Sequence, residues 1–152
     1  MRALPLTAGL LLWAVTLHGQ TASAHKSPTL SWGPAPAVFP AGAKMAVVSG
    51  DPAQAKPFTV ELSFPDGYRI PPHFHPTEET VEVKKGTFLV GMGDTLDVSK
   101  TNTMKVGAKG TLPANHHHYA VAKGATVVSV TSMGPFAMTY VNPADDPQAS
   151  HP

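Results

Sequence analysis

Apolar and polar residues alternate along the middle of the chain with the two-residue period of a β-strand. The clearest case is residues 58–64, where every second side chain is apolar and the others are Thr59, Glu61 and Ser63. This period predicts a strand with one face in a core and one in water. Shorter runs predict further strands at 44–49, 80–85, 87–92, 118–122, 126–132 and 136–141. None of these segments has a sustained helical period.

Turn residues separate the predicted strands. Gly-Asp-Pro stands at 50–52 and Pro-Asp-Gly at 65–67, and Lys85-Gly86 is predicted to be a hairpin turn between antiparallel strands. Pro71-Pro72 is expected to make its sheet edge irregular and open to solvent. Residues 93–105 are polar, and no form is predicted for them. Short strands at this spacing predict an all-β, single-domain sandwich or barrel.

The first 24 residues have the features of a secretory signal. Arg2 precedes an apolar run at 9–17, and Ala22-Ser23-Ala24 is a small-residue cleavage site. The run is shorter than the roughly 20 residues that a membrane span needs. We therefore predict a secreted or periplasmic protein that is cleaved after Ala24 and has no membrane association once the signal is removed.

The remaining chain divides into an arm, a domain and a tail. Residues 25–42 are rich in Pro and Gly and predict an extended arm anchored by Trp32 and Phe39; the domain follows at 43–143. Residues 144–152 are polar and are predicted to be a disordered tail. His25 would be the new terminus and could chelate copper through its ring and α-amine. Because residues 26–42 offer only poor further donors, we expect no copper site there.

Charge and cysteine content restrict the partners and the means of stabilisation. The chain has 11 basic and 10 acidic residues, and removal of Arg2 with the signal leaves ten of each. Such a balance argues against nucleic acid as a partner. No cysteine is present, so a hydrophobic core must hold the fold without disulfides.

Two histidines and a glutamate predict half of a metal site. His73 and His75 are two residues apart, so both imidazoles lie on one face of an extended backbone, and neutral imidazole is the commonest protein ligand for metals. If the extended geometry continues, Glu79 shares that face, with Val81 and Val83 beneath it. The same parity turns the neighbouring residue 78 outward, which favours Glu79 as the carboxylate ligand.

A further ligand is expected from the cluster at 116–118, which holds the other histidines in the body of the chain. Alternation places His116 and His118 on the inward face and His117 on the opposite one. His116 is then either a proton-transferring group at the mouth of the site or a solvated surface residue. Tyr68, Arg69, Tyr119 and Tyr140 are other polar groups that could meet a ligand.

The stretch that contains the first two histidines resembles the first motif of the cupin family. That motif is a glycine, five residues, His-x-His, three or four residues, Glu, six residues and a glycine. Gly67, His73, His75, Glu79 and Gly86 match it without a gap. The resemblance, with the second motif, covers about residues 58–142.

The second cupin motif is matched in part. Gly107, Pro113 and His118 stand at their expected positions, which assigns the fourth ligand to His118. Asn115 replaces a usual glycine, and because Asn tolerates positive φ the turn can survive this change. Ala122 replaces a usual Asn that is not a ligand in the family.

The resemblance implies a double-stranded β-helix, the cupin jelly-roll barrel. It also implies that His73, His75, Glu79 and His118 bind one divalent transition metal. Nitrogen and carboxylate ligands without thiolate suit Mn, Fe, Ni, Cu or Zn. The expected wall of the pocket is apolar, from the side chains Phe58, Val60, Leu62, Val81, Val83, Phe88, Val90, Met92 and Met138.

Two classes of function follow from the resemblance and both stay open. In the first, the protein is an exported dioxygenase, other oxidoreductase or isomerase that acts on a small oxygenated molecule, with Glu79 doubling as a general base when it loosens from the metal. In the second, the metal only holds a small-molecule ligand or braces the fold. Many members of the family pair by sheet extension, so a homodimer is a further possibility.

Overall fold

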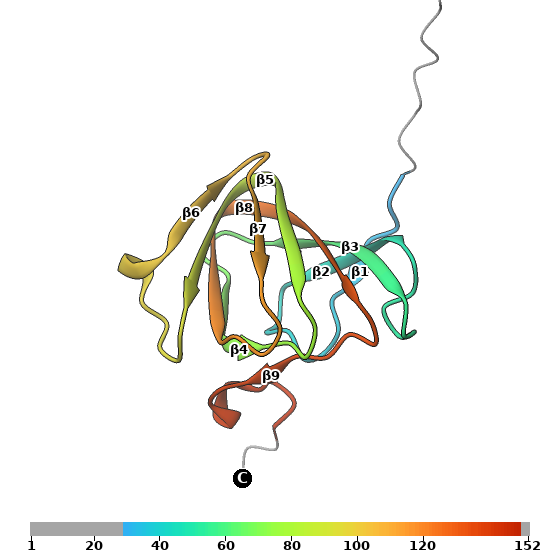
Figure 1. Ribbon diagram of the computed structural model, residues 1–152. Coiled ribbons are helices and arrows are strands. Elements are labelled where there is room, and N and C mark those ends of the chain that lie inside the picture. Colours follow the sequence, from blue (N-terminus) through green and yellow to red (C-terminus); the bar gives the residue numbers. More distant parts are fainter. Residues whose placement is uncertain (1–28, 150–152) are drawn as a thin grey trace, which may run out of the picture.

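The computed structural model describes residues 29–149, which form a curled antiparallel sheet without an α-helix (Figure 1). Its strands are β1 (Gly33–Pro34), β2 (Lys44–Ser49), β3 (Pro57–Phe64), β4 (Arg69–Phe74), β5 (Glu79–Met92), β6 (Asn102–Lys105), β7 (Lys109–Leu112), β8 (His118–Met133) and β9 (Thr139–Tyr140). Two 3-10 helices are η1 (Val98–Lys100) and η2 (Pro143–Asp145). The predicted signal at 1–24 and His25 lie outside the described residues. Within those residues, no helix is long and apolar enough to cross a membrane.

Two long strands, β5 and β8, organise the sheet. They pair antiparallel with each other from Glu79↔Ser132 to Met92↔His118. The other edge of β8 pairs first with β4 and then with β3, and the other edge of β5 pairs with β7 and then with β6. Because each long strand takes part in both halves of the sheet, the sheet curls around a single core.

The bend in β5 lies where the sequence predicted a hairpin turn, and that prediction is wrong. The register between β5 and β8 shifts on both sides of Lys85, and the strand continues through Gly86 at a φ of 75°. A Cβ at Gly86 would lie 2.5 Å from the carbonyl oxygen of Ala125. Gly86 therefore marks a bulge that bends one strand, as bulges do, rather than a turn that ends it.

The predicted strands at 118–122 and 126–132 are likewise one continuous strand, β8. The sequence missed β6 and β7, whose residues are mostly polar. Conversely, only Thr139–Tyr140 of the predicted strand 136–141 is a strand, and the residues before it form a loop. The first two residues of the predicted tail at 144–152 belong to η2, where the Asn142 side chain accepts a hydrogen bond from the Ala144 amide.

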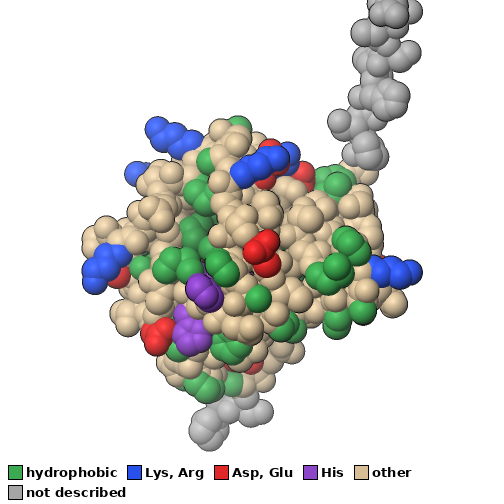
Figure 2. Space-filling model, viewed as in Figure 1, with side chains coloured by type: hydrophobic (Ala, Val, Ile, Leu, Met, Phe, Trp, Pro, Cys, Tyr) green, Lys and Arg blue, Asp and Glu red, His purple; other side chains and the backbone are tan. Residues whose placement is uncertain are grey.

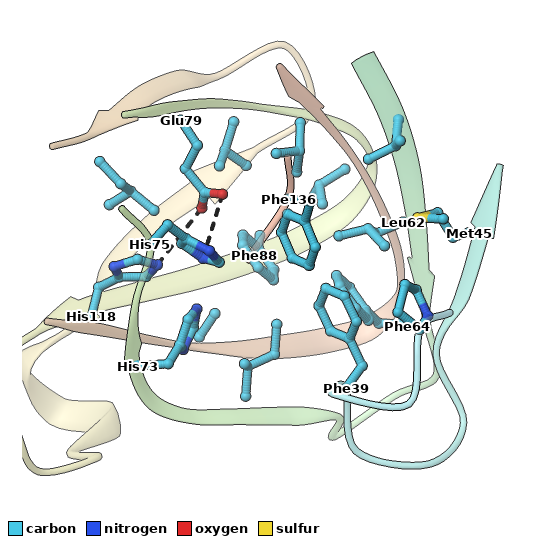
Figure 3. Close-up of a pocket in the computed structure, with 18 of the residues that line it drawn as sticks. Phe39, Met45, Leu62, Phe64, His73, His75, Glu79, Phe88, His118 and Phe136 are labelled. Carbon is cyan, nitrogen blue, oxygen red and sulfur yellow. Dashed lines mark ion pairs between the residues drawn. The ribbon is translucent and has the colours of Figure 1, made fainter. Parts of the chain in front are cut away.

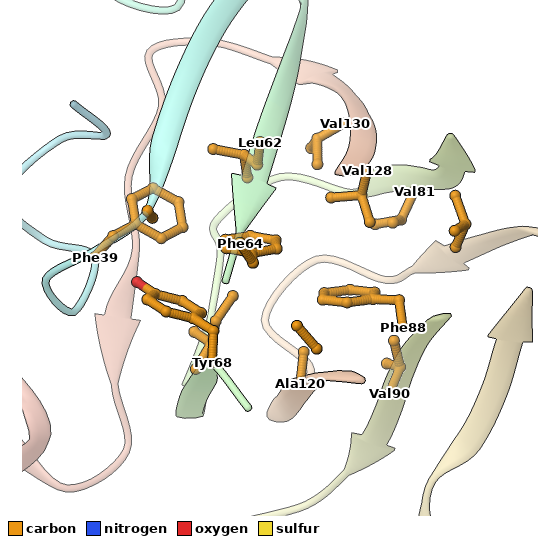
Figure 4. Close-up of a cluster of buried hydrophobic side chains, with 14 of the residues drawn as sticks. Phe39, Leu62, Phe64, Tyr68, Val81, Phe88, Val90, Ala120, Val128 and Val130 are labelled. Atoms are coloured by element: carbon orange, nitrogen blue, oxygen red, sulfur yellow. The ribbon is translucent and has the colours of Figure 1, made fainter. Parts of the chain in front are cut away.

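The hydrophobic core lies inside the curl of the sheet (Figure 4). Phe58, Val60, Leu62 and Phe64 of β3 are all buried, as their alternation predicted. Phe64 stacks on Tyr68 and Phe88 with ring centroids 4.9 and 5.7 Å apart. In the arm, β1 pairs with β2, and Phe39 is buried, whereas Trp32 is 41% exposed and is not the buried anchor that was expected.

We expect Gly91→Ala to destabilise the protein. A Cβ at Gly91 would lie 2.1 Å from Cζ of Tyr119, whose ring is buried and whose hydroxyl donates to the carbonyl of Asp97 at 3.0 Å. Overpacking of this kind costs about 1–3 kcal/mol in the free energy of unfolding, which urea titration measures. Gly33→Ala is the control, because its Cβ meets nothing within 4 Å. Equal losses in both variants would contradict the account of Tyr119.

Candidate metal centre

Strand β4 and the start of β8 bring three histidines together. His73 on β4 is paired in register with His118 on β8, and His75 follows β4 directly. The three residues are between 2% and 6% exposed, and their ligand nitrogens all lie within 4.8 Å of one another. Figure 3 shows the imidazoles turned toward one another at one end of a pocket. The structure therefore collects the three histidines that the sequence selected.

Each imidazole is oriented by a hydrogen bond from Nδ1 to a backbone carbonyl. Nδ1 of His73 lies 2.7 Å from the carbonyl oxygen of Pro71. Nδ1 of His75 lies 2.8 Å from that of Ala137, and Nδ1 of His118 lies 3.0 Å from that of His116. A carbonyl oxygen can only accept, so Nδ1 carries the proton in all three rings. In a neutral ring this leaves the Nε2 lone pair free, which is the arrangement found in metal-binding histidines.

Glu79, the first residue of β5, contributes the carboxylate. Its Oε2 lies 3.6 Å from Nε2 of His75, and its Oε1 lies 3.6 Å from Nε2 of His118. Glu79 is buried, whereas Glu78 is exposed, as the parity argument predicted. It is not a member of the tight three-histidine group, but both of its oxygens face that group.

The chemistry of these residues fits a divalent transition metal. Nε2 of His118 is buried and has no hydrogen-bond partner among the described residues. An unsatisfied buried polar atom costs about 1–3 kcal/mol, and a bound cation would remove this cost. Three neutral imidazoles and one carboxylate are a donor set typical of Mn, Fe, Ni, Cu and Zn. With a divalent ion the site would carry a net charge of about +1.

The pKa of His73 is held well below its ordinary value, first by burial and then by the nearby imidazoles of His118 and His75. The unfolded chain therefore binds more protons than the folded chain, and stability falls as the pH falls. For the metal-free protein we expect the free energy of unfolding to have its full value above the unfolded pKa of about 6.5 and to fall progressively as the pH drops below it.

Urea unfolding of metal-free protein between about pH 7.5 and 5.5 measures this dependence. His73→Asn should flatten the curve, and His116→Asn, at an exposed position, should not. A wild-type free energy of unfolding that stays constant over this range would contradict the burial of a neutral His73.

A cavity of about 60 Å³ extends from the histidines into the core. The expected apolar wall is confirmed for Phe58, Val60, Leu62, Val81, Phe88 and Val90. Val83 and Met138 are absent from the lining, and Met92 is an exposed residue on the outside. Phe39 and Phe136 also line the cavity. The sequence assigned them no such role, because an arm and a loop have no periodicity from which to read it.

The other two histidines of the cluster lie outside the cavity. His116 is exposed and borders a groove that Met92 and Met104 also line. Figure 2 shows histidines beside a strip of hydrophobic side chains on this face. The prediction that His116 faces inward is wrong, because β8 begins only at His118 and strand alternation does not extend into the preceding turn.

His117 faces away from the cavity, as predicted. Its Nδ1 lies 2.6 Å from a carboxylate oxygen of Asp94, and its ring lies 5.1 Å from that of Phe74. Asn115 has a φ of 60°, which confirms that this position needs a residue tolerant of positive φ. Its amide donates to the carbonyl of His75 at 2.8 Å and so joins the two histidine segments.

The edge at Pro71-Pro72 is irregular, as predicted, but it is not open. The register between β4 and β8 shifts between Ile70 and His73. Strand β9 then covers the edge, with His73 paired to Tyr140 and the amide of Val141 donating to the carbonyl of Pro72. The predicted opening of this edge to solvent is therefore wrong.

The sequence matches no protein-family model and no curated protein. Solved structures do resemble the fold. A candidate acetylacetone dioxygenase from Methylibium petroleiphilum PM1 aligns over 95% of this chain and 91% of its own, with a TM-score of 0.59 and 19% identity. Oxalate oxidase aligns over 69% of this chain and 58% of its own, with a TM-score of 0.53 and 21% identity.

A third similar structure is an RmlC-like cupin from Shewanella frigidimarina NCIMB 400, which aligns over 62% of this chain and 80% of its own, with a TM-score of 0.52 and 18% identity. A cupin superfamily protein from Desulfitobacterium hafniense DCB-2 aligns over 61% of this chain and 78% of its own, with a TM-score of 0.52 and 12% identity. Identities at this level show the fold alone. The chain thus has the all-β jelly-roll fold of the cupin superfamily.

Proposed function

We propose that the protein is an exported metal-dependent enzyme that acts on a small oxygenated molecule. The observation that carries the proposal is the convergence of three buried Nε2 atoms, each fixed by a carbonyl at Nδ1, on one end of an apolar cavity. His73, His75, His118 and Glu79 are the proposed ligands of one divalent metal. Export rests on the signal-like residues 1–24, which lie outside the described residues.

A bound metal would polarise a carbonyl or stabilise an enolate and, if redox active, would also bind dioxygen. The chain itself supplies the base. Within the described residues, the nearest basic groups to the Glu79 carboxylate are Nε2 of His75 and Nε2 of His118, both at 3.6 Å, so no tight ion pair would hold it when it loosens from the metal. It can take a proton from the carbon next to a carbonyl, while the electrons of the broken C–H bond stay on the substrate as an enolate.

The rest of the cavity would keep water away from this proton transfer. Apart from the histidines and Glu79, the side chains that line it are apolar. Removal of water strengthens the electrostatic interactions of a charged intermediate with the groups around it. Dioxygenase and isomerase chemistry can both start from such an enolate, and one of the similar folds belongs to a candidate acetylacetone dioxygenase.

The alternative function is that of a non-catalytic metal-binding or small-molecule-binding protein. The small volume of the cavity favours it, since about 60 Å³ is well below the roughly 300 Å³ of an ordinary ligand pocket. In that case the metal would mainly join β4, β5 and β8. A homodimer remains an expectation for either function.

The two functions are separated by metal content and turnover of the purified protein. We expect about one transition metal per chain, and oxygen consumption or isomerisation with small diketones such as acetylacetone or with small carboxylates. Removal of the metal by a chelator should abolish turnover, and readdition should restore it. Metal-loaded protein that binds these compounds without converting any of them would favour the binding protein.

A further inference from the structure

We propose that the site takes a small monoanion with an oxygen-donor head and a short apolar body, and that the ring of Phe136 limits the length of that body. This inference rests on the proposed metal site. The head would be a carboxylate or an enolate at the histidine end, and the body would lie along the apolar wall.

The charge of the cavity selects the head. A divalent ion with three neutral imidazoles and one carboxylate leaves about one positive charge, and His73, His75, His118 and Glu79 are the only titratable side chains in the lining formed by residues 29–149. A buried net charge is costly unless it is paired. A monoanion neutralises the site, whereas a neutral ligand leaves the charge and a dianion reverses it.

The volume of the cavity limits the body. A space of about 60 Å³ holds only a few water-sized groups, since one water needs roughly 10–15 Å³ measured in this way. The apolar wall offers no partner for polar groups beyond the head. Short alkyl chains therefore fit, and long or polar ones do not.

Phe136 is a cavity-lining side chain that packs beside the histidines. Its ring lies 5.5 Å from the ring of His75, stacks on Phe39 at 5.9 Å and meets Phe58 edge-on at 6.3 Å. Figure 3 shows Phe136 between the imidazoles and the apolar end near Leu62 and Met45. Removal of this ring would lengthen the space next to the head.

The backbone around Phe136 is held independently of its ring. The amide of Phe136 donates to the carbonyl of Pro52 at 2.7 Å, and the amide of Gly134 donates to the carbonyl of Lys56 at 3.0 Å. The carbonyl that orients His75 belongs to Ala137, the next residue. Truncation of the ring therefore removes its packing against the imidazole of His75 but keeps the hydrogen bond that orients that imidazole.

Co²⁺-loaded protein titrated with straight-chain carboxylates from acetate to octanoate tests this inference, with the visible spectrum of the metal as the readout. We expect wild-type affinity to fall sharply beyond the short chains. Phe136→Ala should bind hexanoate at least about tenfold more tightly than wild type, because each newly buried methylene contributes about fourfold. Acetate affinity and cobalt content should stay unchanged.

Phe74→Ala is the matched control. Phe74 lies between two of the histidines in the sequence, is half-buried and packs on His117 outside the cavity. It should keep the wild-type dependence on chain length. Phe136→Leu removes less volume and should raise the longest carboxylate that binds well by less than Phe136→Ala does. This variant provides a second measurement if the alanine variant folds poorly.

Each contrary result has a distinct meaning. A length limit that is the same in wild type and in both Phe136 variants overturns the role of the ring. Primary amides that bind as tightly as carboxylates of the same length overturn the choice of a monoanion. Folded protein that takes up no Co²⁺ refutes the proposed metal site itself, and the inference falls with it.

Discussion

Replacement of His118 by alanine should leave the protein largely metal-free, whereas His117→Ala should stay loaded. His118 is buried, directs Nε2 toward the other imidazoles and has no other partner for that atom among the described residues. His117 faces outward and is engaged with Asp94. Loss of a direct ligand should lower metal affinity by more than the roughly 10–100-fold that outer groups contribute. Metal content after dialysis against a weak chelator measures the difference.

The two variants control each other, because the same substitution is made at neighbouring positions. Circular dichroism should show that both are folded. If metal is lost from His117→Ala instead, or equally from both variants, the assignment of His118 rather than His117 as a metal ligand is wrong.

Glu79→Gln should lower turnover by about 10²–10⁴-fold, the range expected for loss of a general base. Glutamine keeps the shape and one oxygen donor of the side chain but cannot take a proton at neutral pH. Glu78→Gln is the control at an exposed neighbouring position and should retain activity. Turnover at matched metal content, with any substrate found by oxygen consumption or isomerisation, gives the comparison.

Metal content must be reported for both variants, since Glu79 is also a proposed ligand. A Glu79→Gln protein that is fully loaded and fully active would remove the general base from the mechanism. A variant that is inactive only because it is empty would show that Glu79 acts as a ligand alone.

The fold and the grouping of the histidines could be read from the sequence because both depend on short-range spacing. His73 and His75 share a face of one short segment, whereas Glu79, Val81 and Val83 belong to a separate strand, β5, so the predicted alternation from 73 to 83 is interrupted at 75–78. The match of Pro113 to the second motif then separated His118 from its two neighbours. The structure places these residues where the motif implies.

Features that depend on tertiary contacts were missed or mistaken. Gly86 looked like a turn residue, but a bulge needs the same positive φ, and only the pairing of β5 with β8 distinguishes the two. The inward position of His116 was wrong because alternation applies only within a strand. Phe136 reached the cavity through a loop fixed by long-range backbone hydrogen bonds, which leave no local pattern in the sequence.

His73, His75, His118 and Glu79 are proposed to hold one divalent metal. The most direct measurement is anomalous X-ray scattering from crystals of the metal-loaded protein. The account predicts a single strong peak about 2.0–2.1 Å from Nε2 of His73, His75 and His118, the usual metal–imidazole distance for zinc, with a carboxylate oxygen of Glu79 as the fourth ligand. A peak at His116 or His117 instead, or loaded protein without a peak among the three imidazoles, would contradict it.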